Sequence, residues 1–147
     1  MNCNFSKAMK RFNHLLSEID ATYHEMSLKL GLSDSAMIIL YTICDNDDKN
    51  SCLLQDICHR SGLSKQTINS SLRQLESKGI LYLEAITPKS KNVCLTDRGK
   101  QLANQTAGRV IQAENEIFAS WPQEDVEKYL ALTESFLLAL RDKAKNL

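Results

Sequence analysis

The sequence contains little glycine and proline, with 5 and 2 residues respectively among 147. This scarcity disfavours β-sandwiches, collagen-like repeats and disordered linkers, and it favours long helices joined by short turns. The sequence also lacks an apolar run of about 18 residues, and its first residues show no basic stretch followed by an apolar segment. We therefore expect a cytoplasmic protein without a membrane partner, folded as a single domain over residues 1–147.

Net charge is absent as well, because 18 Lys or Arg balance 18 Asp or Glu. Taken over the whole chain, this balance argues against a nucleic-acid partner. The charge is unevenly distributed, however. Residues 58–100 hold eight Lys or Arg against three Asp or Glu, so the rest of the chain carries the acidic excess. The sequence therefore predicts a basic segment flanked by acidic segments. With this distribution, the zero net charge of the whole chain no longer argues against binding to DNA.

The five cysteines are odd in number and widely spaced, and no C-x-x-C motif occurs. Reduced thiols are expected. The spacing of Cys52, Cys58 and His59 matches no common zinc pattern, so we expect no metal and no cofactor. A thiol enzyme or redox carrier would need a cysteine beside a base. The adjacent pair Cys58-His59 points about 100° apart on a helix, and motifs of catalytic residues are otherwise absent, so the sequence predicts no enzyme and no catalytic residue.

Apolar residues at steps of three and four predict a long amphipathic helix over residues 5–30, closed by Gly31. A second helix follows Ser33 and carries Met37, Leu40, Tyr41 and Cys44 on one face. It ends in the polar loop 45–50. A helix from about residue 96 to about residue 120, and another after Trp121-Pro122, are predicted at the other end of the chain.

The middle of the chain predicts a short helix from Leu53, a tight turn at Gly62 and a second helix that begins after Ser64. Ile68, Leu72 and Leu75 share the inner face of this second helix, and its outer face is polar. Strands at 80–85 and 93–95 then enclose a turn-rich segment with a basic tip. This order predicts a mainly α protein with a small β-hairpin, a winged helix-turn-helix over residues 33–100.

Such a fold presents a recognition helix, here residues 64–78, and a wing, here residues 85–93, to double-stranded DNA. Hydroxyl and amide side chains of the helix can read base edges in the major groove, and lysines of the wing can neutralise phosphates. The DNA-binding candidates are Ser64, Lys65, Gln66, Thr67, Asn69, Ser70, Arg73, Lys89, Ser90 and Lys91.

The terminal segments 1–31 and 101–147 carry more apolar surface than helices flanking a small domain can hide alone, and we expect them to pair two copies of the chain. A two-fold homodimer would place two recognition helices about one DNA turn apart and would bind a pseudo-palindromic operator. The side chains concerned are Phe5, Phe12, Ile117, Phe118, Trp121, Tyr129, Phe136, Leu137 and Leu140.

Three blocks resemble the multiple-antibiotic-resistance regulator (MarR) family of bacterial transcription factors: residues 61–68 (SGLSKQTI), 75–80 (LESKGI) and 93–99 (VCLTDRG). The resemblance implies a dimeric regulator, in the first instance a repressor, whose first and last two helices form the dimer interface. The family often carries an Asp and an Arg in the wing, and Thr87 and Lys89 stand at those positions here. Lysine keeps the charge but lacks the planar fork of arginine, so we expect this wing to bind phosphates rather than read bases.

The resemblance also implies release from DNA by a small aromatic effector or by oxidation of a cysteine. The candidates for an effector pocket are His14, Tyr23, His24, Met37 and Tyr41. Cys3 is the candidate redox sensor, since Lys7 lies one turn away. Two other functions stay open: a thiol-based redox-sensing regulator or cysteine-dependent redox protein, and a winged-helix module that binds proteins rather than DNA.

Overall fold

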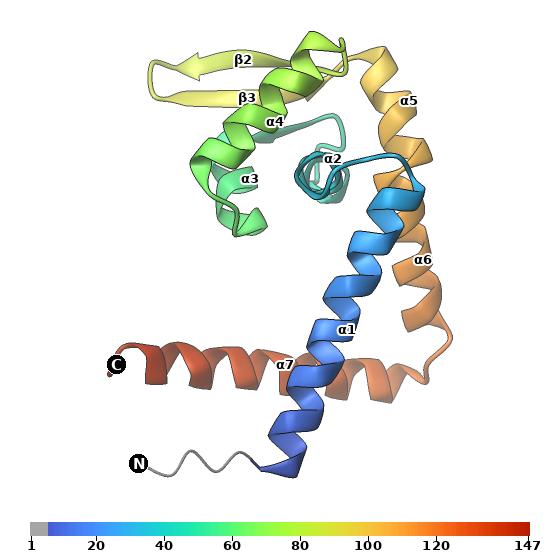
Figure 1. The fold of residues 1–147 in the computed structure, drawn as a ribbon, viewed down its shortest axis with the longest axis vertical. Helices are drawn as coiled ribbons and strands as arrows, with labels where there is room; N and C mark the ends of the chain where they lie inside the picture. Colours follow the sequence, from blue (N-terminus) through green and yellow to red (C-terminus); the bar gives the residue numbers. More distant parts are fainter. Residues whose placement is uncertain (1–5) are drawn as a thin grey trace. The chain divides into compact units, whose positions relative to one another are not determined.

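The computed structural model describes residues 6–147, which form seven helices and a three-stranded antiparallel sheet (Figure 1). They separate into two compact units, one through Ile111 and one from Gln112 to Leu147. The first, called the winged unit below, contains α1 Lys7–Lys29, α2 Asp34–Asp45, β1 Ser51–Leu53, α3 Leu54–Ser61, α4 Lys65–Ser77, β2 Leu81–Thr87, β3 Ser90–Leu95 and α5 Asp97–Gln105. Helix α6 (Ala107–Ala119) passes from the first unit into the second, which also holds α7 (Gln123–Ala144).

The predicted helix boundaries are confirmed where side-chain caps define them. The hydroxyls of Ser33, Ser64 and Thr96 each accept a hydrogen bond from a backbone N–H in the first turn of α2, α4 and α5. Gly62 ends α3 with a φ of 67°, a left-handed conformation that residues with a Cβ adopt only at a cost. The turn between α3 and α4 is therefore short, as the sequence predicts.

The sheet has the strand order β1-β3-β2, and the β2–β3 hairpin extends from it as a ribbon (Figure 1). Cys52 of β1 and Leu83 of β2 both face Val93 of β3. Cys52 and Val93 are buried, whereas Tyr82, one position along from Leu83, is exposed. One face of the sheet therefore closes the core, and the other faces away from it.

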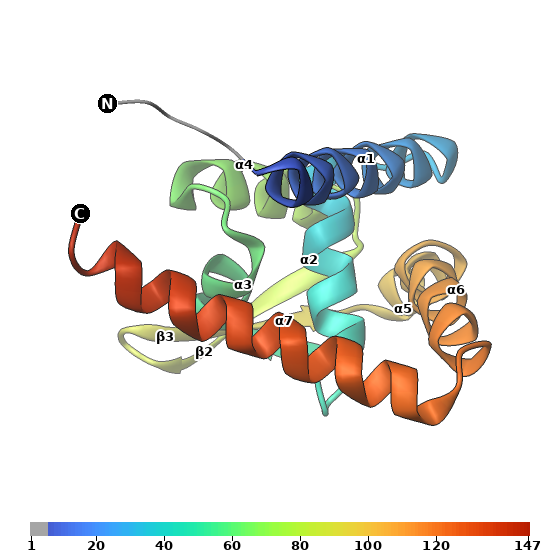
Figure 2. The ribbon, with the colours of Figure 1, turned by 90° about the horizontal axis from the view of Figure 1, so that it is seen from below.

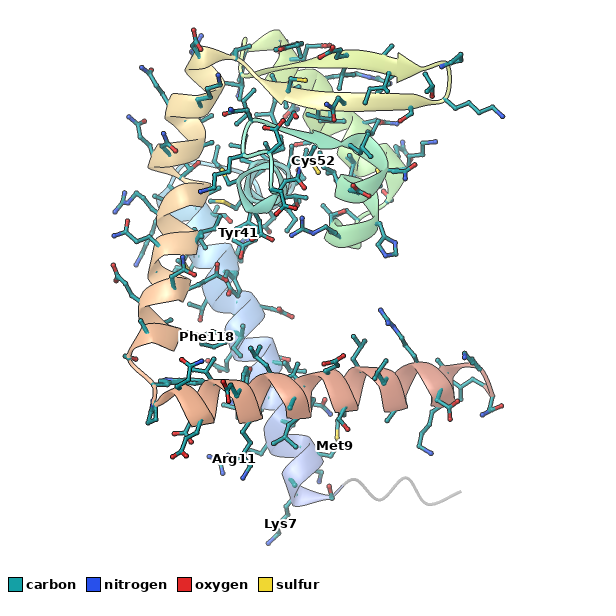
Figure 3. The ribbon with its side chains drawn as sticks, turned by 180° about the vertical axis from the view of Figure 1, so that it is seen from behind. Lys7, Met9, Arg11, Tyr41, Cys52 and Phe118 are labelled. Carbon is teal, nitrogen blue, oxygen red and sulfur yellow. The ribbon has the colours of Figure 1, made fainter. Side chains whose placement is uncertain are left out.

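Helix α2 lies at the centre of the winged unit. It contributes three side chains with no exposed surface, and it contacts α3, α4, α5, β1 and α1. Helices α1 and α2 meet at 93°, as the crossing in Figure 2 illustrates. Figure 3 locates Tyr41 and Cys52 in this unit. The largest fully buried apolar side chains are Ile39, Leu40, Ile43, Ile57, Ile68, Leu81, Val93 and Cys52. Their packing holds α4 against the sheet and against α2. It therefore determines which face of α4 points outward.

The sheet differs from its prediction in two ways. Strand β1 was not predicted, because residues 51–53 are too few to show a period and they run straight into α3. The hairpin is also longer than predicted, since β2 continues to Thr87 and β3 begins at Ser90, which leaves only Pro88 and Lys89 in the turn. Cross-strand hydrogen bonds thus order residues whose composition resembles a loop.

The single helix predicted from about residue 96 to about residue 120 is wrong, because Thr106 divides it into α5 and α6. Thr106 has a non-helical backbone (φ −123°, ψ −89°) and is buried. Its hydroxyl donates to the backbone carbonyl of Leu102 at 2.7 Å. The local bond satisfies the buried hydroxyl. Gly108, the helix-breaking residue type nearest the interruption, lies two positions later and inside α6, so it does not mark where the helix is interrupted.

Aromatic side chains gather where α6 ends and α7 begins. Trp121 lies 5.3 Å from Phe118 and 5.5 Å from Tyr129 between ring centroids, and the second pair is edge to face. Pro122 precedes α7 as its N-cap rather than occupying its first turn as predicted. Its fixed φ still starts the helix without loss of a needed donor.

Among the described helices, none alone has the length and apolar content to cross a membrane. Helices α1 and α2 meet that criterion only when they are taken together, across the sharp bend between them. The α2 part of this pair contains the buried core side chains described above. Burial of this kind is typical of a core helix.

Candidate nucleic-acid interface

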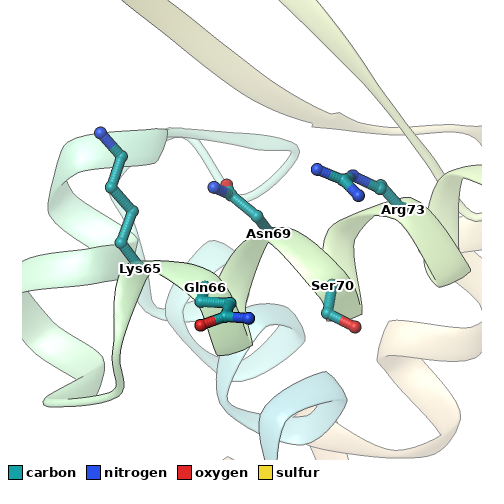
Figure 4. A pocket seen from close by; sticks show the side chains of 5 residues that line it. All are labelled: Lys65, Gln66, Asn69, Ser70 and Arg73. Carbon is teal, nitrogen blue, oxygen red and sulfur yellow. The ribbon is translucent and has the colours of Figure 1, made fainter.

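Helix α4 displays a continuous polar face on the outside of the winged unit. Its buried side chains, Ile68, Leu72 and Leu75 with Ser71 beside them, all lie on the opposite side. The outer face forms a shallow hollow of about 470 Å³. Five side chains line it: Lys65, Gln66, Asn69, Ser70 and Arg73 (Figure 4). The periodicity of the sequence predicted all five as DNA-binding candidates, and the structure brings them together.

The five side chains form two rows along the helix. Lys65, Asn69 and Arg73 are spaced four residues apart and project along one side in Figure 4, whereas Gln66 and Ser70 project along the other. Asn69 is half-buried and the other four are exposed. A helix rises about 1.5 Å per residue, so each row places a polar group about every 6 Å.

These five side chains have no hydrogen-bond or ion-pair partner within residues 6–147. Two other cations of the basic segment are paired: Arg60 with Asp45, and Lys100 with Asp97 at 3.7 Å. Lys65 and Arg73, the two cations of the hollow, are therefore available to a ligand. The charges of Arg60 and Lys100 are partly neutralised by their carboxylate partners. The Arg60–Asp45 pair spans 15 residues and depends on how α2 and α3 pack, which the sequence does not show, whereas Asp97 lies only three residues from Lys100.

Ser64 has a structural role at the start of α4. Its hydroxyl accepts a hydrogen bond from the backbone N–H of Thr67 at 3.1 Å and lies 2.8 Å from the Thr67 hydroxyl. Both side chains are exposed. The pair therefore fixes the end of α4 that the sequence predicts to approach DNA.

We expect Ser64→Ala to lower the free energy of unfolding by about 1 kcal/mol, because the alanine leaves the Thr67 amide without its cap. Ser64→Asn is the matched control, since asparagine also caps helices well, and it should stay near wild type. Urea denaturation followed by circular dichroism measures both. Equal stability of all three proteins would show that the cap contributes nothing.

The wing places its lysines at the end of the hairpin. Lys89 is exposed in the two-residue turn, and its backbone N–H donates to the Thr87 hydroxyl at 3.3 Å. Lys91 is exposed in β3 and is the cross-strand partner of Ala85, while Ser90 is half-buried. The three candidates are thus neighbours, and the two lysines at the tip have no ion-pair partner among the described residues.

The outer face of the sheet holds a polar group that sequence analysis did not identify. Tyr82 and Cys94 are cross-strand partners, and the Cys94 thiol donates to Glu84 Oε2 at 3.6 Å. Burial raises the pKa of the Cys94 thiol, and Glu84 raises it further. The pKa of the Tyr82 hydroxyl is raised in turn by Cys94. These groups stay protonated at neutral pH, so this face carries no reactive thiolate.

The effector-pocket candidates are dispersed along α1 and α2. His14 is exposed and lies 3.6 Å from Glu18, and His24 Nδ1 lies 2.6 Å from Asp34 Oδ2. Met37 belongs to the hydrophobic core, and Tyr41 is half-buried against it; Tyr23 is exposed. Their grouping in one pocket stays a prediction.

The structure does not favour thiol chemistry. Burial raises the pKa of Cys44 and of Cys52, as it does that of Cys94, and a reactive cysteine needs the opposite shift. Cys58 is half-buried against the core. Cys3 lies outside the described residues, as does Phe5. Among residues 6–147, no cluster of three potential metal ligands occurs.

Comparisons with known proteins point to one kind of fold. A family model described as a helix-turn-helix domain matches residues 30–81. A MarR family regulator from Neisseria meningitidis is similar in structure, with a TM-score of 0.81 and 15% identity over 96% of this chain and 99% of that one. MepR from S. aureus, in a DNA-binding conformation, has a TM-score of 0.73 and 19% identity, covering 92% of this chain and 99% of that one.

BpsR from Bordetella bronchiseptica, whose DNA binding is regulated by 6-hydroxynicotinic acid, has a TM-score of 0.62 and 16% identity, covering 86% of this chain and 98% of that one. The search among curated proteins finds no match. The similarity to these three structures extends over 86% to 96% of this chain. The chain therefore has the winged helix-turn-helix fold of the MarR family of transcriptional regulators.

Proposed function

We propose that this protein is a homodimeric transcriptional regulator, acting as a repressor, which binds a pseudo-palindromic operator in double-stranded DNA. The observation that carries the proposal is the outer face of α4, where five polar side chains, two of them cations, have no partner within the described residues. No Asp or Glu occurs between Asp56 and Glu76. Such a face suits the acceptors of a DNA groove and its phosphates.

Helix α4 and the wing have different roles in this proposal. The amides and Arg73 on α4 contact base edges in the major groove, since their side chains match the donor and acceptor patterns presented there. Ser64 and Thr67 approach the backbone at the start of the helix. Lys89 and Lys91 neutralise phosphates, and Ser90 can donate to a phosphate oxygen beside them. The wing thus adds affinity, and α4 adds specificity.

The homodimer is supported by the apolar surface of α7, which has no buried residue. One face of this helix carries large apolar side chains at helical spacing, and in the single chain about half of the surface of each is exposed. We define the apolar stripe of α7 as Tyr129, Leu130, Phe136, Leu137 and Leu140, whose exposed fractions lie between 42% and 54%. A second copy of the chain is the proposed cover for this stripe, because a regulator of a palindromic site needs two-fold symmetry.

A small aromatic molecule is the proposed effector. The support comes from a protein of similar fold, BpsR, whose DNA binding responds to 6-hydroxynicotinic acid. The candidate residues on α1 and α2 are those given above, and His24 and Asp34 join these two helices in this chain. A ligand that separates this pair would change the angle between the helices and with it the position of α4.

The test of DNA binding starts from a selection of random duplexes, followed by fluorescence anisotropy on the selected DNA. Arg73→Ala should weaken binding about fivefold or more, because a bidentate base contact by an arginine is worth about 1–3 kcal/mol. Lys89→Ala should weaken binding to selected and unselected duplexes alike and lower the slope of log K against log salt by about one.

Arg109→Ala is the matched control, because Arg109 is an exposed arginine on α6, outside the hollow of α4. It should bind within about twofold of wild type. A wild-type protein that enriches no sequence at low salt would contradict the proposed function. Equal binding by all the variants would contradict the assignment of α4 and would favour a protein-binding role for the winged unit.

A further inference from the structure

The row formed by Lys65, Asn69 and Arg73 restricts which bases α4 can read. All three side chains project along the same side of the helix, and none has a partner within residues 6–147. Lys and Arg are donors only, while an asparagine amide offers both a donor and an acceptor. No group on this row, and none on the neighbouring row of Gln66 and Ser70, is acceptor-only.

This donor and acceptor pattern selects purines. Arginine matches the two acceptors of guanine, N7 and O6, and asparagine matches adenine, which presents the N7 acceptor beside the N6 donor. Reading cytosine in the major groove requires an acceptor for its N4 amino group, for which Asp and Glu are suited. Cytosine offers only that amino donor, which the Asn69 amide oxygen can accept while the Asn69 NH2 group stays unpaired, so the two-bond match to adenine is favoured.

The helix rise sets the distance between the two bases. Asn69 and Arg73 are four residues apart, which corresponds to about 6 Å along the axis. Base pairs of B-DNA are about 3.4 Å apart. When the axis follows the groove, the two side chains therefore reach bases about two pairs apart on one strand. Lys65, a further 6 Å or so away at the start of the helix, lies where phosphates flank the groove.

Asn69 is suited to a specific contact because it is half-buried. Its side chain has fewer accessible rotamers than the exposed Gln66 on the next row, so less conformational entropy is lost when it binds a base. Arg73 is longer and exposed, but a planar guanidinium can make two parallel hydrogen bonds to guanine. We therefore expect Asn69 and Arg73 each to discriminate strongly between bases at one position of the DNA site.

We propose that each operator half-site contains an adenine read by Asn69 and, about two base pairs away on the same strand, a guanine read by Arg73. This inference rests on the proposed function, because it requires α4 to lie in the major groove. It adds the identity and spacing of two bases, which neither the fold nor the similar structures supply.

The test repeats the duplex selection with full-length wild-type protein, Asn69→Ala and Arg73→Ala. Wild type should enrich an adenine and a guanine about two pairs apart in each half-site. Asn69→Ala should lose the preference at the adenine alone, and Arg73→Ala at the guanine alone, each by about tenfold. Asn104→Ala and Arg109→Ala replace exposed residues of the same types outside the hollow and should preserve both preferences.

A modified base separates direct contact from an effect on folding. Replacing the selected guanine by 7-deazaguanine removes its N7 acceptor, so wild type should lose about fivefold or more in affinity while Arg73→Ala loses nothing further. A wild-type protein that enriches no sequence overturns the proposed function. A clear motif that lacks this adenine and guanine, or whose preferences survive both substitutions, overturns only the base assignment.

Discussion

Gly99→Ala is expected to destabilise the protein by about 3 kcal/mol or more. Gly99 is buried in α5, against the chain segment that links α4 to β2. A Cβ on this residue would overlap the backbone oxygen of Ile80 and lie 2.9 Å from its carbonyl carbon. A carbonyl group cannot rotate aside as a long side chain can. The added methyl would therefore push α5 away from the start of the hairpin.

The contacts that hold Ile80 make this displacement costly. The backbone N–H of Thr96 donates to the Ile80 carbonyl at 3.1 Å, and the Thr96 hydroxyl donates to the Gly79 carbonyl at 2.6 Å. The same hydroxyl accepts from the Gly99 N–H at 3.0 Å and caps α5. Moving Gly99 thus strains the cap, the end of α4 and the start of β2 together, since they share these bonds.

Gly108→Ala is the matched control, because it adds the same methyl to a helical glycine of α6. Its nearest neighbour would be the Ala103 carbonyl oxygen at 3.3 Å, which a small shift relieves. Alanine is also the better helix former, so this variant should stay within about 1 kcal/mol of wild type. Urea denaturation of the two variants measures the difference. Equal stabilities would show that the winged unit adapts to a methyl at Gly99 without cost.

The sequence predicted Thr96 as a helix cap but not why a glycine follows it three residues later. The cap is a local feature, visible in the residue type and its position before Asp97. The close approach of Gly99 to Ile80 joins residues 19 apart in the chain, and no periodicity reports it. The same limit explains why β1 was missed, since its pairing with β3 links Cys52 to Val93.

The candidate site was more predictable than the sheet, for a physical reason. A helix repeats every 3.6 residues, so the inward positions of Ile68, Leu72 and Leu75 determine which residues of α4 point outward. The helical period does not show which of the outward side chains form ion pairs with other parts of the protein. Arg60 is bound by Asp45 because α2 packs against α3, whereas Arg73 on α4 has no ion-pair partner within residues 6–147. Which of these cations are available to bind DNA therefore follows from the structure and not from the helical period.

Leu137→Glu is expected to convert the proposed homodimer into a monomer at concentrations where the wild type is dimeric. Leu137 belongs to the apolar stripe of α7 and is 42% exposed in the single chain. If a second copy covers the stripe, the substitution places a carboxylate in that interface without a partner, at a cost of several kcal/mol. The dissociation constant of the dimer should rise about a hundredfold or more. Sedimentation velocity over a dilution series measures it.

Leu138→Glu is the control that makes this prediction specific to one face. Leu138 is the next residue of the same helix and is 55% exposed, and the 100° step of the helix turns it away from the stripe. It should leave the dimer intact, so that equal effects of both substitutions would contradict the stripe as the interface.

Operator binding should be weakened by Leu137→Glu and not by Leu138→Glu, as dimerisation is. A monomer engages one half-site without the gain of about 10²–10⁴ that linkage of two recognition helices supplies, so Leu137→Glu should lose most of its affinity for the full operator while Leu138→Glu keeps it.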